Sequence, residues 1–85
     1  MKTFTYVIKD KDGVHARPAG IIVSEAKKYQ SNISISCRGK TADLKRIFGI
    51  MGLCIKAGEE VTIKIEGPDE EACQDAILKV FSINL

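Results

Sequence analysis

Apolar and polar residues alternate in three short segments of this chain, and that period of two restricts the folds open to it. The three apolar sets are Phe4, Tyr6 and Ile8; Ile33, Ile35 and Cys37; and Val61, Ile63 and Ile65. Such alternation is typical of a strand with one buried and one solvated face. Strands of this kind favour an antiparallel sheet, and the helices must then pack together on its buried face.

Between these segments, apolar residues recur at helical spacing. A first helix is expected from about Ala16 to about Tyr29, a short one from about Arg46 to about Gly52, and a last one after Asp69, a plausible N-cap. A short strand near Thr41 completes the order βαββαβα. The residues expected to face the core from the first and last helices are Ala19, Ile22, Val23, Ala26 and Tyr29, and Cys73, Ala76, Ile77 and Val80. The residues alone therefore predict an α+β fold with an antiparallel sheet and helices on one side.

Length and composition exclude several classes of function. Eighty-five residues make one domain, 1–85, with a modest core. The net charge of +2 is too small to indicate nucleic-acid binding without a basic stripe. No apolar run is long enough for a membrane span or a signal peptide, so a cytoplasmic location without membrane insertion is expected. Cys37, Cys54 and Cys73 lack metal-ligand spacing; we expect small buried side chains there, and no metal or cofactor.

The only histidine lies just before the first expected helix, in the stretch Gly13-Val14-His15-Ala16-Arg17-Pro18-Ala19. A helix N-terminus attracts anions because its first N–H groups lack partners. Arg17 adds a planar guanidinium suited to phosphate oxygens, and Pro18 fits the first helical turn. This pattern suggests that His15 takes up a phosphoryl group. The alternatives are a phosphate-binding site without a covalent step, a hydrolytic histidine, and an ordinary surface or structural histidine.

The same stretch resembles the active-site signature of the HPr family, the histidine-containing phosphocarriers of the bacterial sugar phosphotransferase system. The segments 43–53 and 58–63 also resemble that family, and the resemblance covers essentially the whole chain. It implies an open-faced sandwich, with a four-stranded antiparallel sheet of order 1-4-2-3 and three helices on one face.

The resemblance also implies a function and its residues. Enzyme I, phosphorylated from phosphoenolpyruvate, would pass its phosphoryl group to Nδ1 of His15, which would then donate it to sugar-specific A domains. Arg17 would neutralise the phosphate oxygens, and the amides of Ala16 and Arg17 would cap them. The carrier is expected to act as a monomer. The alternatives are an HPr-like regulatory paralogue that signals through protein contacts and a small-molecule-binding α+β domain.

The segment from Leu44 to Leu53 is too apolar for all of it to be buried in so small a domain. An exposed apolar patch, typical of a partner surface, is therefore expected; the alternative is a short helix buried all round. The resemblance assigns Ile47, Phe48 and Met51 to the surface that faces enzyme I and the A domains. The basic residues expected around this patch, with Lys27 and Lys45 at the interface itself, are Arg17, Lys27, Lys28, Lys45, Arg46 and Lys56.

Two residues depart from the family pattern. Most members have a regulatory serine, phosphorylated by an ATP-dependent kinase in many Gram-positive bacteria, where this chain has Arg46. Arginine cannot accept that phosphate. Asp12 replaces a residue that is usually neutral and polar, beside the phosphorylation site. Its carboxylate is expected to tune phosphoryl transfer by charge repulsion, or else simply to cap the turn or the helix.

Overall fold

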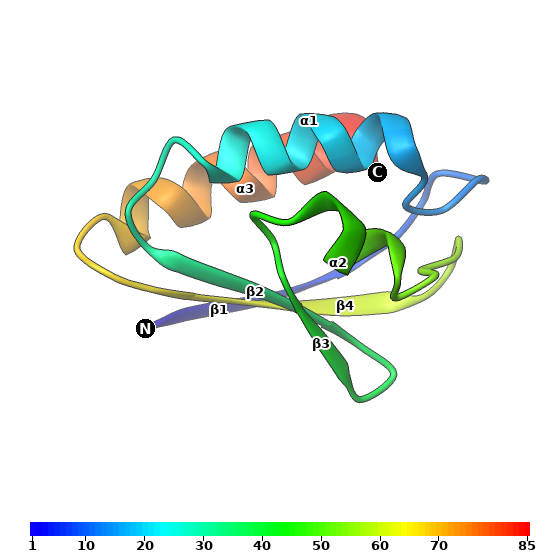
Figure 1. Cartoon of the computed structure of the whole chain (residues 1–85), viewed down its shortest axis with the longest axis horizontal. Coiled ribbons are helices and arrows are strands. Elements are labelled where there is room, and N and C mark those ends of the chain that lie inside the picture. Colours follow the sequence, from blue (N-terminus) through cyan, green and yellow to red (C-terminus); the bar gives the residue numbers. More distant parts are fainter.

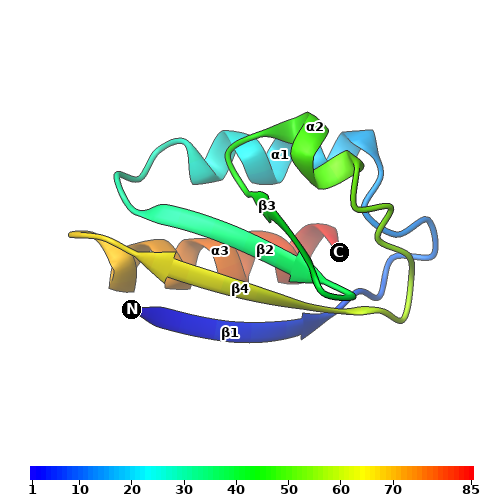
Figure 2. The same ribbon diagram turned by 60° about the horizontal axis from the view of Figure 1, so that its bottom comes forward.

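The computed structural model describes residues 1–85 as four strands and three helices. In chain order they are β1 (Lys2–Val7), α1 (Ala16–Ala26), β2 (Asn32–Cys37), β3 (Lys40–Asp43), α2 (Ile47–Met51), β4 (Glu60–Glu66) and α3 (Glu70–Asn84). The strands form one antiparallel sheet of order β1-β4-β2-β3 (Figure 2). All three helices cover the same face of it, and the other face is open (Figure 1). The predicted open-faced sandwich is confirmed.

The apolar residues of the three alternating segments pair with one another across neighbouring strands. On β4, Ile63 pairs with Ile35 of β2 on one side and with Phe4 of β1 on the other. The predicted apolar residues of β2 and β4 are all buried under the helices. Phe81 of α3, which the predicted inward face omitted, is fully buried over β1, and its ring centroid lies 5.6 Å from that of Tyr6 in an edge-on contact.

The first helix is shorter than predicted. It ends at Ala26 rather than near Tyr29, because the amides of Lys28 and Tyr29 donate to carbonyls only three residues earlier. This tighter turn leaves Tyr29 half-buried against the core, where the helical pattern had placed it.

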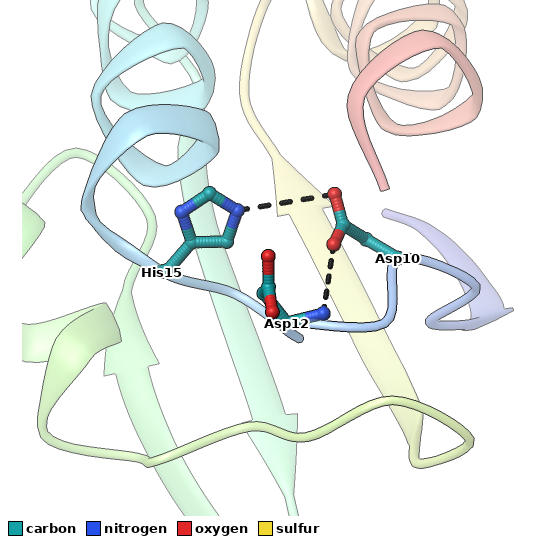
Figure 3. A group of neighbouring side chains, drawn as sticks. All are labelled: Asp10, Asp12 and His15. Atoms are coloured by element: carbon teal, nitrogen blue, oxygen red, sulfur yellow. Dashed lines mark hydrogen bonds and ion pairs between the residues drawn. The ribbon is translucent and has the colours of Figure 1, made fainter.

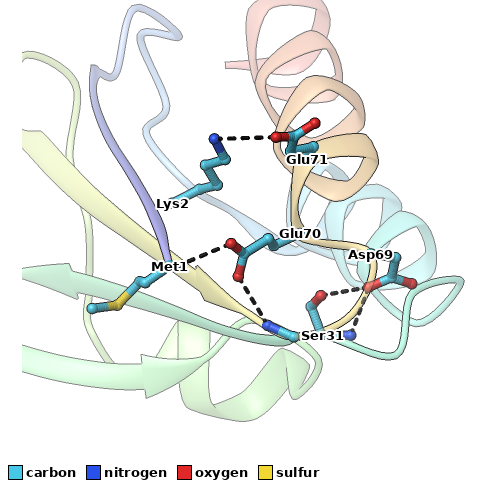
Figure 4. Close-up of polar contacts among 7 residues, drawn as sticks. Met1, Lys2, Ser31, Asp69, Glu70 and Glu71 are labelled. Carbon is cyan, nitrogen blue, oxygen red and sulfur yellow. Dashed lines mark hydrogen bonds and ion pairs between the residues drawn. The ribbon is translucent and has the colours of Figure 1, made fainter.

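The carboxylate of Asp69 does not cap α3, although Asp69 occupies the N-cap position. It accepts a hydrogen bond from the backbone N–H of Gln30 at 2.8 Å. It also accepts from the backbone N–H of Ser31 at 3.0 Å and from the Ser31 hydroxyl (Figure 4). Glu70, in the first turn of α3, accepts from the amino group of Met1 at 3.0 Å. The carboxylate expected to serve its own helix instead ties the start of α3 to the connection between α1 and β2.

Removing this tie is expected to destabilise the fold in a pH-dependent way. The hydroxyl of Ser31 and the N–H of Gln30 hold the pKa of Asp69 below its usual value. A carboxyl whose pKa is lower in the folded state stabilises the fold above its unfolded pKa, and that contribution is lost as the pH falls through the folded pKa. Asp69→Asn should therefore lower Tm at neutral pH, and the difference from the wild type should shrink below about pH 4.

Thermal unfolding followed by circular dichroism across that range measures the effect. Asp75→Asn is the matched control, because Asp75 is an exposed carboxylate of the same helix with no hydrogen bond or ion pair. A Tm difference for Asp69→Asn that stays constant at every pH would contradict the role given to the ionised carboxylate.

Two of the three cysteines are buried as expected, and the third is not. Cys37 and Cys73 lie in the core, and burial raises the pKa of Cys73 to about 11. Cys54 is exposed, contrary to the prediction, because it adopts a left-handed φ of 51° in the turn between buried Leu53 and Ile55. None of the three helices has the length and apolar character needed to cross a membrane.

Candidate functional site

His15 lies at the start of α1, as predicted. It occupies the N-cap position with an extended backbone, φ −94° and ψ −178°, and its carbonyl accepts the amide of Ala19 at 3.1 Å. The amides of Ala16 and Arg17 belong to the first turn and have no acceptor within the helix, while Pro18 has no N–H to satisfy. The imidazole is 40% exposed. One accessible side chain therefore stands beside N–H groups that are free to bind an anion.

The loop that delivers His15 is held against the rest of the fold. The amide of Val14 donates to the carbonyl of Ile55 at 3.0 Å, and that of Gly13 donates to the carbonyl of Asp10 at 2.9 Å. Gly13 has φ +67°, and a Cβ there would collide with the carbonyl oxygen of Ile55. This position therefore requires glycine, and the backbone entering the helix is fixed.

Two carboxylates lie next to the imidazole, although only one was predicted (Figure 3). Oδ2 of Asp10 is 3.8 Å from Nε2 of His15, and Oδ1 of Asp10 accepts the amide of Asp12 at 2.9 Å. The carboxylate of Asp12 accepts no hydrogen bond, so the alternative that Asp12 merely caps the turn or the helix is wrong. Asp10 caps that turn instead. The turn composition of residues 10–13 was visible in the sequence, but the direction of the Asp10 side chain was not.

Asp10, Asp12 and His15 also form the one group of side chains in the chain that could hold a metal ion. One donor atom from each lies within 4.8 Å of the others. A set of one imidazole nitrogen and two carboxylate oxygens suits a divalent cation, although exposed acidic groups commonly gather without one. For an anion bound at His15, the same group places two negative charges nearby.

Arg17 is exposed, as predicted, and its guanidinium forms no hydrogen bond or ion pair within the protein. Its donors are therefore all available to a ligand. An arginine fixed by internal pairs would have to break them before it could bind phosphate oxygens.

The apolar segment around α2 is partly exposed, so the alternative of a helix buried all round is wrong. Phe48 is 87% exposed, Ile47 and Met51 are half-buried against the core, and Ile50 is fully buried. Ile47 also lies over Gly20, so α2 packs beside α1 (Figure 2). Phe48 is the apolar side chain of α2 that solvent reaches most fully.

The predicted ring of basic residues is only partly free. The Nζ of Lys45 donates to the carbonyl of Tyr29 at 2.7 Å, and the Nε of Arg46 lies 3.7 Å from a carboxylate oxygen of Asp43. Lys28 pairs with a glutamate one turn earlier. Within the predicted ring, the side chains without any internal partner are Arg17, Lys27 and Lys56. Electrostatic attraction of an acidic partner would depend mainly on these three.

The fold and this site define an α+β domain that presents a partly exposed histidine and an unpaired arginine at a helix N-terminus. A family model described as the PTS HPr component phosphorylation site matches residues 2–82. The chain therefore belongs to the HPr family of phosphocarrier proteins.

Known proteins similar to this chain agree with that assignment. The phosphocarrier protein HPr of Mycoplasma pneumoniae is 44% identical over 82 residues, covering 95% of this chain and 93% of that protein. The crystal structure of an HPr from Thermoanaerobacter tengcongensis matches with a TM-score of 0.93 at 38% identity, covering 99% of this chain and 94% of the other. Crh, a catabolite repression protein of Bacillus subtilis, matches with a TM-score of 0.78 at 30% identity, covering 94% and 92%.

Proposed function

We propose that this protein is a phosphoryl carrier of the bacterial sugar phosphotransferase system. It accepts a phosphoryl group from enzyme I on His15 and donates it to sugar-specific A domains. The observation that carries the proposal is a partly exposed imidazole at the N-terminus of α1, in a chain that belongs to the HPr family. In this proposal, Arg17 and the free backbone amides of Ala16 and Arg17 bind the phosphate.

In phosphoryl transfer, a protein contributes mainly by positioning the reacting groups and by stabilising charge. In the proposed step the lone pair of His15 Nδ1 attacks phosphorus, the bond from phosphorus to the donor breaks, and the donor leaves with that electron pair. The amides of Ala16 and Arg17 and the Arg17 guanidinium bind the phosphoryl oxygens in transit. The reverse sequence delivers the group to the next partner.

The proposal also covers the oligomeric state, the cellular location and the ligands of this carrier. We propose that residues 1–85 act as one monomeric domain in the cytoplasm, without nucleic-acid binding, membrane insertion or a cofactor. In support of a single domain, β2, β4 and the three helices contribute to one cluster of 20 buried residues, and Phe4 and Tyr6 of β1 and Ala42 of β3 pack against it. The net charge is only +2.

Transfer from phosphoenolpyruvate tests the proposal directly. The protein is incubated with labelled phosphoenolpyruvate and purified enzyme I, and then with an A domain. The expected result is one acid-labile phosphate per chain, discharged when the A domain is added. A chain that stays unlabelled, while a known HPr is labelled in the same reaction, would rule the function out.

A regulatory paralogue is the second candidate, favoured by Arg46 and by the similarity of the fold to Crh. Arg46 occupies the N-cap position of α2 and offers no hydroxyl, so we propose that a seryl kinase cannot modify this chain at that position. The two candidates differ in the second step of the assay. A regulatory paralogue would be expected to leave the A domain unlabelled.

The partner surface proposed for this carrier comprises Ile47, Phe48 and Met51, with Lys27 and Lys45 beside them. Phe48→Glu is expected to weaken binding to enzyme I by about tenfold or more, because it places a charge where an apolar side chain would be buried by the partner. The fold should be unaffected, since Phe48 is 87% exposed. Titration calorimetry and thermal unfolding measure the two effects.

Ile83→Glu is the matched control for that variant, because Ile83 is also apolar and 70% exposed but lies on α3. It should bind enzyme I as the wild type does. Equal loss of affinity in both variants, or unfolding of Phe48→Glu, would argue against a specific surface at α2.

Asp12 is proposed to make the phosphorylated state a better donor. Its carboxylate is exposed, has no hydrogen bond, and lies within the group of donor atoms around His15. The Asp12 carboxylate and a phosphate on His15 would repel each other, and neutralising the carboxylate removes that repulsion. Asp12→Asn should therefore raise the phosphorylated fraction at equilibrium with enzyme I, and the gain should shrink at high salt.

Quantifying phosphohistidine at several enzyme I ratios measures that equilibrium. Asp75→Asn on α3 removes one charge from a residue outside the group formed by Asp10, Asp12 and His15, and should leave the phosphorylated fraction unchanged. If the phosphorylated fraction of Asp12→Asn equals that of the wild type at low salt, Asp12 does not influence phosphoryl transfer.

A further inference from the structure

We propose that Asp10 is a positioning residue for the phosphoryl acceptor: it holds His15 in the tautomer with the proton on Nε2, which leaves the lone pair on Nδ1 free. This inference rests on the proposed function, in which Nδ1 accepts the group. Oδ2 of Asp10 is the carboxylate oxygen that faces the ring, 3.8 Å from Nε2. Figure 3 shows the other ring nitrogen on the side away from Asp10.

The direction of the effect follows from donor and acceptor chemistry. A neutral imidazole carries one N–H, on either nitrogen, and an ionised carboxylate can only accept. The carboxylate beside Nε2 therefore stabilises the proton there and disfavours the form with the proton on Nδ1. Carboxylates orient imidazoles in this way where the second ring nitrogen serves as a ligand or a base.

Asp10 is itself held firmly enough to act on the ring. Its Oδ1 accepts the amide of Asp12 at 2.9 Å, its own amide donates to the Leu85 carbonyl at 2.8 Å, and its carbonyl accepts the amide of Gly13 at 2.9 Å. With Oδ1 and the backbone engaged, Oδ2 is left to face the imidazole. The 3.8 Å separation exceeds a hydrogen bond, and contacts of this kind often shorten when a reacting partner binds.

Asp12 lacks this arrangement, although it carries the same charge in the same group. It forms no ion pair with the ring and no hydrogen bond through its carboxylate. Asp12 can therefore influence bound phosphate by charge, whereas Asp10 can also select the tautomer. The two residues make a matched pair for experiment.

Asp10→Asn tests the tautomer directly. The amide oxygen can keep the hydrogen bond from the Asp12 N–H, while the NH₂ group then faces the ring as a donor and favours a lone pair on Nε2. ¹⁵N NMR of the His15 ring, at a pH where the imidazole is neutral, measures the proportion of each tautomer. We expect the proton mainly on Nε2 in the wild type, and a shift of the ratio toward Nδ1–H by about fivefold in Asp10→Asn.

Asp12→Asn should leave the tautomer ratio at its wild-type value. Asp10→Ala, which offers the ring neither donor nor acceptor, should shift the ratio in the same direction by less, provided thermal unfolding shows a folded chain. One ratio shared by the wild type, Asp10→Asn and Asp12→Asn would overturn the proposal.

Transfer rates from enzyme I supply the functional readout. Asp10→Asn and Asp12→Asn each remove one negative charge near His15, so their difference excludes the general effect of charge. Asp10→Asn should accept the phosphoryl group several-fold more slowly than Asp12→Asn, because less of the ring offers a free Nδ1. Equal rates would overturn the positioning role, whereas an unlabelled wild type would overturn the proposed function and leave the spectra as the test of Asp10.

Discussion

Replacing His15 with alanine is expected to abolish phosphoryl uptake from enzyme I completely. His15 is the only histidine in the chain, so no second imidazole can form the acid-labile bond. Its imidazole is 40% exposed, at the N-terminus of α1. The measurement is labelled transfer from phosphoenolpyruvate, with acid lability and the mass of the intact protein recorded for wild type and variant.

The loss should be chemical rather than structural. The imidazole makes no capping hydrogen bond to α1, and its contact with Asp10 is a distant one at 3.8 Å. Tm should therefore change little. His15→Gln, which keeps a polar side chain of similar size, should be equally inactive. Acid-labile label that persists in either folded variant would place the acceptor elsewhere.

The sheet could be predicted from the sequence because its signal is local. Alternation within residues 33–37 and 61–65 reports which side chains face the core, and the structure buries them all. The pairing of β4 with both β1 and β2 was not available from the residues themselves; the order 1-4-2-3 came from the family resemblance. Alternation shows which side chains of a strand face the core, but it does not show which strand pairs with it.

The errors arise where distant segments determine the outcome. Asp69 bonds to residues 38 and 39 positions earlier rather than to its own helix, a choice that no pattern near Asp69 reveals. Lys45 similarly donates to a carbonyl 16 residues away and is less available than its place in a basic cluster suggested. In both cases the side chain satisfies backbone groups of another segment, instead of capping its own helix (Asp69) or staying free for a partner (Lys45).

The site divides in the same way. The positions of His15 and Arg17 at the start of α1 could be predicted, because both lie within one short stretch where residues close in sequence are also close in space. Asp10 lies only five residues before His15, yet was missed. Its role depends on the turn that brings Oδ2 toward the ring, and residue type shows that a turn is present without showing where its side chains point.

Arg17→Ala should reduce the rate of phosphoryl transfer by at least tenfold, and by as much as about 10²–10³-fold if the guanidinium acts like other positioned donors to developing charge. Its guanidinium has no partner within the protein, so its removal leaves no buried group unsatisfied and Tm should hardly change. Single-turnover transfer from phosphorylated enzyme I, followed by rapid quenching, measures the rate apart from product release.

Two further variants separate local stabilisation of phosphate from general attraction. Arg17→Lys keeps the charge but loses the planar pair of donors, and should fall between wild type and Arg17→Ala. Lys27→Ala removes another unpaired cation, at the far end of α1, and should affect only the salt-dependent encounter with enzyme I. If Arg17→Ala and Lys27→Ala lose the same rate, and high salt cancels both losses, Arg17 serves to attract the partner rather than to hold the phosphate. If Arg17 holds the phosphate, the loss of rate should persist at high salt in Arg17→Ala and not in Lys27→Ala.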